Sequence, residues 1–143
     1  MEEIMATNRF EAEALPPVVR RRVWNVFLWV LQIAAAGMFF FAAWGKLTAN
    51  PLMVATFEAI GLGQWFRVFT GALEVIGATI LLTPRLAGAG ATLLAVIMVG
   101  AVLTHLFILG GSPLLPLLLL VAMLLVAFSR PNGIRQAYHS LAG

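Results

Sequence analysis

The stretch LAGAGATLLAVIMVGAVLTHLFILG, residues 86–110, contains no aspartate, glutamate, lysine or arginine. A helix needs about 20 apolar residues to cross the hydrocarbon core of a bilayer, so this stretch is long enough to span it. The strands of a membrane barrel alternate apolar and polar residues, and this stretch does not. The segment therefore predicts a membrane-spanning helix.

The composition of the whole chain also indicates a protein surrounded by lipid. Hydrophobic residues make up 62% of the sequence, charged residues 10%, and the mean hydropathy is +0.98. An average soluble domain has about 25% charged residues, and a small one cannot bury this much apolar surface. The absence of cysteine excludes disulfides, thiol redox chemistry and thiolate metal sites. Although the net charge is +3, the arginines lie beside apolar runs, which indicates a membrane topology and no nucleic-acid partner.

Three further apolar segments are expected to span the membrane: 23–45, 66–83 and 113–128. The last two are short and require snorkelling ends or local bilayer thinning. Between the first two spans, Asn50-Pro51 is a helix-start signal and Gly61 a stop signal. We therefore predict an all-α, integral membrane four-helix bundle, with a short interfacial helix between spans one and two.

Positive charges predict the orientation of the four spans. The arginines that flank the spans on one side are Arg20, Arg21, Arg22, Arg85, Arg130 and Arg135, and only Lys46 and Arg67 flank them on the other. The positive-inside rule then places both termini in the cytoplasm. The expected organisation is an N-terminal tail (1–22), a membrane bundle (23–129) and a C-terminal tail (130–143). A signal peptide is the alternative for the first span, but the apolar run continues through Met38 to Phe41, which favours an uncleaved span.

A carboxylate inside an apolar span marks the candidate site. Placing Glu74 at membrane depth costs roughly 2.5–3.5 kcal/mol on insertion scales. Counted from the ends of their spans, Glu74 and His105 lie roughly 10 Å and 8 Å below the same surface. Arg67 lies two turns above Glu74, and Lys46 ends the first span at that level. We predict a polar cluster of Lys46, Arg67, Glu74 and His105. Glu74 and His105 are expected in contact or near contact, with Lys46 as the main rival partner of Glu74.

This cluster has two interpretations. It is a site for a quinone headgroup or a proton, because a carboxylate and an imidazole can exchange protons near neutral pH. Alternatively, Glu74 pairs with Lys46 or His105 only to fix helix packing, and His105 donates to a carbonyl one turn back. Gln32 is expected to form a structural hydrogen bond between helices. No nucleotide loop, metal-binding pair or serine nucleophile is visible, so catalysis would need a partner or a bound cofactor.

Four short motifs carry a family resemblance: Gly45-Lys46-Leu47, Ile60-Gly61-Leu62-Gly63, Gly71-Ala72-Leu73-Glu74 and Pro84-Arg85. In this order and spacing, the chain resembles the DoxX family of small four-span membrane proteins, in its DoxX-like branch, over about residues 23–128. The resemblance implies a four-helix bundle in the bacterial inner membrane. Some members resemble small subunits of quinone-linked sulfur-oxidising or respiratory complexes. Lys46 and Glu74 correspond to the recurring polar positions of the family.

The leading hypothesis for function is an accessory subunit of a quinone-linked membrane redox system, not catalytic alone. Its expected cofactor is a quinone, and its expected partners are the bilayer and other membrane subunits or a second copy. One alternative is a membrane assembly factor, chaperone or scaffold that binds another membrane protein. A second alternative is a small-solute or proton pathway.

Overall fold

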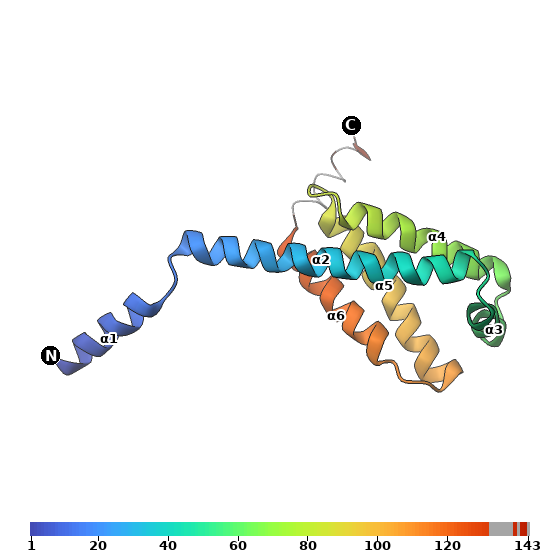
Figure 1. Cartoon of the computed structure of the whole chain (residues 1–143), viewed down its shortest axis with the longest axis horizontal. Helices are drawn as coiled ribbons and strands as arrows, with labels where there is room; N and C mark the ends of the chain where they lie inside the picture. The colour runs from blue at the N-terminus through green and yellow to red at the C-terminus, as the bar shows by residue number, and fades with distance from the viewer. Residues whose placement is uncertain (132–138, 140, 143) are drawn as a thin grey trace. The chain divides into compact units, whose positions relative to one another are not determined.

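The structure is a computed structural model, and it describes residues 1–131, 139, 141 and 142, without the side chains of 8–13. The described residues form α-helices α1 to α6 and one π-helical segment, η1, and they include no strand (Figure 1). The predicted all-α class is therefore confirmed. Most of the expected C-terminal tail, including Arg135, lies outside the described residues. The chain divides into two units, residues 1–30 and 31–143.

The first unit contains α1 (Glu2–Glu13) and the beginning of α2 (Pro17–Leu47). Pro16 and Pro17 disfavour a helical backbone at the residue before each of them, which separates the two helices. Proline is tolerated in the first turn of a helix, and arginine is a good helix former. The α2 helix consequently starts at Pro17 and not at the first apolar residue, Val23. The expected N-terminal tail is thus helical in two places, which the sequence analysis did not predict.

The second unit contains the rest of α2, followed by α3 (Pro51–Ile60), α4 (Gln64–Leu81), α5 (Ala87–Thr104), η1 (His105–Leu109) and α6 (Leu114–Ser129). The α5 helix packs against both α4 and α6 and lies between them in Figure 1. The short α3 packs against α4 and η1. The fully buried core includes Phe39, Leu81, Leu94 and Met123.

Glycines set the register between α4 and α5. A Cβ atom added to Gly90 would lie 2.5 Å from the backbone nitrogen of Leu81, and one added to Gly77 would lie 2.7 Å from the Leu94 side chain. Small residues of this kind let two helix backbones approach closely. The two contacts pair the end of α4 with the beginning of α5, as expected of antiparallel neighbours.

The helix predicted between the first two spans is confirmed at residues 51–60. The Asn50 side chain accepts a hydrogen bond from the Leu52 N–H at 3.0 Å, which caps the first turn. Gly61 ends the helix with a φ of 80°, in the left-handed region that glycine adopts without strain. Phe57 is buried and packs against Phe66 of α4, with ring centroids 5.9 Å apart.

The helices expose large apolar side chains along their length. Phe41, Phe107 and Phe128, for example, are 77%, 79% and 82% exposed. Among the described residues, two helices are long and apolar enough to cross a membrane, 17–47 and the continuous 87–109. Two others, 51–60 and 114–129, are shorter apolar helices. Apolar patches this extensive mark contact with a membrane or another protein.

Candidate functional site

The centre of the candidate site is an ion pair between Lys46 and Glu74. Lys46 Nζ donates to Glu74 Oε1 at 3.0 Å and to Oε2 at 2.9 Å, so one ammonium group serves both carboxylate oxygens. Lys46 lies in the last turn of α2, and Glu74 lies in the middle of α4. The side chains are 13% and 3% exposed. A nearly buried carboxylate is stable in its ionised form only when it is paired and hydrogen-bonded, as Glu74 is here.

Gly71 allows this pair to form. It lies three residues before Glu74 and therefore on the same face of α4. A Cβ atom at Gly71 would lie 3.1 Å from Cβ of Lys46 and 3.2 Å from Cγ of Leu47. The end of α2 therefore packs directly over the α4 backbone at this glycine, and the aliphatic stem of Lys46 extends along α4 to the carboxylate.

Arg67 belongs to the same region, but no hydrogen bond or ion pair joins it to Glu74 among the described residues. Its Nη1 donates to the backbone carbonyl of Lys46, and its Nε donates to Gln64 Oε1 at 2.7 Å. Gln64 Nε2 in turn donates to the carbonyl of Val54 in α3 at 3.1 Å. The same carbonyl accepts from the Ala49 N–H at 3.4 Å in the turn after α2, so Arg67 is its second donor, and a cation at this end of α2 complements the helix dipole. Arg67 thus connects the ends of α2, α3 and α4.

His105 does not join this network. Its Nδ1 lies 2.9 Å from the carbonyl of Ala101, one turn back in its own helix. In the part of the chain that the structure describes, no hydrogen bond or ion pair joins His105 to Glu74. The expected direct contact between these two residues is therefore wrong.

The register of the helices explains this error. The contacts of Gly90 with Leu81 and of Gly77 with Leu94 place Glu74 level with Ile97. His105 lies eight residues further along α5, or roughly 12 Å at 1.5 Å per residue. Depths counted from the ends of the spans had put the two residues at the same level.

A second polar cluster lies at the other end of these helices. Gln32 is fully buried, its Nε2 donates to the Leu81 carbonyl at 2.9 Å, and its Oε1 accepts from Arg130 Nε at 2.7 Å. Gly88 allows the Arg130 backbone to approach α5, because a Cβ atom at this position would collide with the Arg130 carbonyl oxygen. The cluster joins α2, the end of α4 and the residue that follows α6.

Two residues of these networks were absent from the predicted site. Gln64 was not singled out, although its position three residues before Arg67 on a helix was a usable signal. Arg130 was interpreted only as a charge that sets topology, and its hydrogen bond to Gln32 depends on packing between residues 98 positions apart.

A known protein family covers most of the chain, including the Lys46–Glu74 pair. The model of the DoxX-like family matches residues 30–128, a range that includes Gln32, Lys46, Arg67, Glu74 and His105. Searches of curated proteins and of solved structures gave no match. Because the family match covers well over half of the sequence, the chain belongs to the DoxX-like family, and its apolar helices make it a membrane protein.

Proposed function

We propose that this protein is a four-span subunit of the bacterial inner membrane, with both termini in the cytoplasm, that assists a quinone-linked redox system. The charge pattern supports the orientation, since Arg85 and Arg130 lie at one end of the bundle and Lys46 and Arg67 at the other. At 1.5 Å per residue, α4 and α6 are roughly 24–27 Å long, close to the thickness of the hydrocarbon core.

The observation that carries the proposal is the Lys46–Glu74 pair within the membrane portion. An ammonium group has three N–H donors, and two of those of Lys46 point to Glu74. The third donor is available to a quinone carbonyl oxygen. The Lys46 side chain is 13% exposed, so a headgroup can reach it from outside the bundle. Glu74 then exchanges a proton with the headgroup.

The chemistry requires a partner. Reduction of a quinone to a quinol consumes two electrons and two protons, and the electrons would come from a redox centre in another subunit. The part of this chain would be to hold the headgroup through Lys46 and to transfer a proton through Glu74. A chain that binds the quinone and transfers a proton, while another subunit supplies the electrons, is an accessory subunit.

Purification from native membranes tests this function. A tagged chain isolated in mild detergent should retain a redox subunit and extractable quinone. Because both oxygens of the Glu74 carboxylate hold the Lys46 ammonium group in position, Glu74→Gln should lower the quinone content. Glu58→Gln, the same change at an exposed position of α3, should leave it unchanged. Isolation of the wild-type chain with neither quinone nor a redox subunit would contradict the proposal.

One observation favours a second candidate, a membrane scaffold or assembly factor. Both oxygens of Glu74 are already bonded to Lys46, and within the described residues every buried side-chain nitrogen or oxygen has a partner. A fully satisfied ion pair is sufficient to fix helix packing. A protein partner that remains bound to both the wild type and Glu74→Gln, in the absence of quinone, would favour the scaffold.

A further inference from the structure

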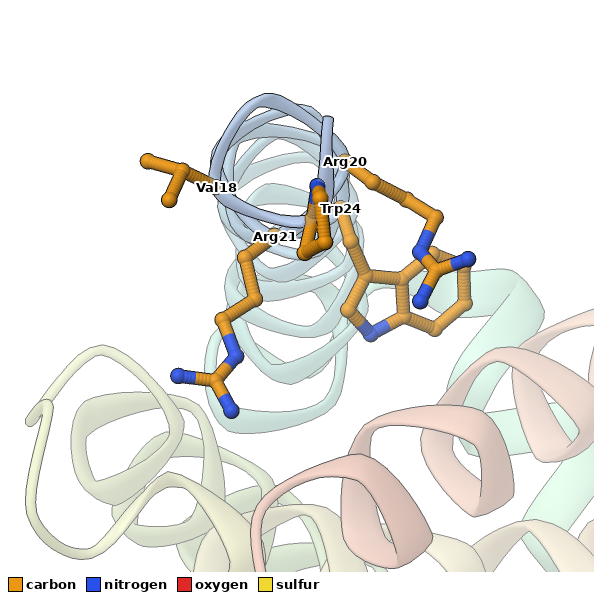
Figure 2. Close-up of a pocket in the computed structure, with 5 residues that line it drawn as sticks. Val18, Arg20, Arg21 and Trp24 are labelled. Carbon is orange, nitrogen blue, oxygen red and sulfur yellow. The ribbon is translucent and has the colours of Figure 1, made fainter. Parts of the chain in front are cut away.

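The beginning of α2 carries a face that the redox proposal does not use. Arg20 and Arg21 lie three and four residues after Pro17, and Trp24 lies four and three residues after them, so Pro17 and Trp24 each share a side of the helix with both arginines. Together with Val18, they line a hollow of about 560 Å³ (Figure 2). We call this surface the Arg20/Arg21 face.

The side chains of the Arg20/Arg21 face suit a phosphate group. Figure 2 shows Arg21 on one side of the hollow and Arg20 with Trp24 on the other. All three side chains are exposed, and within the described residues neither guanidinium group forms an ion pair or hydrogen bond. A guanidinium group presents a planar fork of donors that matches the oxygens of a phosphate, and two such groups beside one hollow complement its charge.

The position of this face along the chain identifies the source of the phosphate. The apolar part of α2 begins at Val23, so the arginines lie within one turn of the hydrocarbon boundary. Tryptophan is enriched at that boundary because its ring is apolar and its N–H is polar. Basic residues next to a span attract anionic lipids. We infer that the Arg20/Arg21 face binds the headgroup of an anionic phospholipid, with the phosphate between the two guanidinium groups.

The neighbouring arginine provides a matched control. Arg22 is also exposed and carries the same charge, but it does not line the hollow. Native mass spectrometry of the purified chain, titrated with phosphatidylglycerol or phosphatidylcholine, measures bound lipid directly. We expect Arg20→Gln and Arg21→Gln each to weaken phosphatidylglycerol binding about fivefold, which corresponds to about 1 kcal/mol for each arginine near a membrane surface. Arg22→Gln should change it by less than about twofold.

Three results would overturn the inference. Equal losses in all three variants would indicate diffuse attraction by the total charge. Equal binding of the two lipids by the wild-type chain would remove the role of headgroup charge. Displacement of phosphatidylglycerol by inorganic phosphate would identify a site for free anions. Circular dichroism of each variant checks that the helices are intact, which is expected because all three arginines are exposed.

Discussion

Replacing Lys46 with methionine removes the ammonium group and keeps the length of the side chain. Glu74 then loses both hydrogen bonds, at 2.9 Å and 3.0 Å, while its side chain is only 3% exposed. Because Glu74 lies in the middle of α4, it cannot reach water by extending along the helix. Removing one partner of a buried ion pair costs about 3–5 kcal/mol, and we expect Lys46→Met to lower the free energy of unfolding by that amount.

The reverse change should cost less. Glu74→Met leaves a lysine in the last turn of α2, where its side chain is 13% exposed and its flexible stem can carry the charge to the surface. We expect a loss of about 1–3 kcal/mol, the cost of a polar group with incomplete hydrogen bonding. The double variant removes both charges and replaces them with apolar side chains, so its stability should lie within about 1 kcal/mol of the wild type.

These differences in the free energy of unfolding can be measured for the wild type, the two single variants and the double variant. Each protein is unfolded in mixed micelles with increasing sodium dodecyl sulfate and followed by circular dichroism. The informative quantity is the coupling between the two changes. A double variant that loses the sum of the two single losses would refute the reasoning, because the side chains would then act independently. Equal losses in the two single variants would refute the asymmetry derived from their exposure.

Three further results are expected. Gly90→Ala should destabilise the bundle by about 1–3 kcal/mol, because the new methyl group would lie 2.5 Å from the Leu81 backbone nitrogen; Gly100→Ala, at which no atom lies within 4 Å of the added Cβ, should not lower the melting temperature. Alkaline phosphatase fused after Gly143 should be inactive if that end is cytoplasmic, and activity would contradict the topology. Spin labels placed in turn along 51–60 should show a helical period of lipid accessibility if α3 lies on the membrane surface, and uniform exposure to water would contradict that placement.

Features that depend on nearby residues could be predicted from the sequence. The bounds of α3 follow from Asn50, Pro51 and Gly61, whose effects are exerted within one turn of the helix. The apolar helices 17–47 and 87–109 were recognisable because long apolar runs mark them in the sequence. Glu74 was recognisable for a similar reason, since a carboxylate in an apolar run is costly wherever the run packs.

Features that depend on how helices pack could not be predicted. The level of His105 relative to Glu74 depends on which glycine of α4 meets which residue of α5, and many glycine and alanine positions in these helices would permit other registers. The π-helical segment that begins at His105 has no recognisable pattern in the sequence. Lys46 and His105 were both expected as possible partners of Glu74, and the choice between them depends on the close approach of α2 and α4 at Gly71.

Binding of a short-chain quinone analogue to the purified chain in lipid nanodiscs tests the central claim most directly. The proposal predicts saturable binding by the wild type and unchanged binding by Glu58→Gln, with all proteins folded by circular dichroism. It predicts loss of binding in Glu74→Gln, because the Lys46 ammonium group that holds the headgroup is then no longer fixed by the carboxylate. Glutamine retains the shape of Glu74 and one hydrogen-bond acceptor but not its charge or its exchangeable proton. Saturable binding of equal affinity in Glu74→Gln, or no saturable binding by the folded wild type, would contradict the assignment of the Lys46–Glu74 pair as a quinone site.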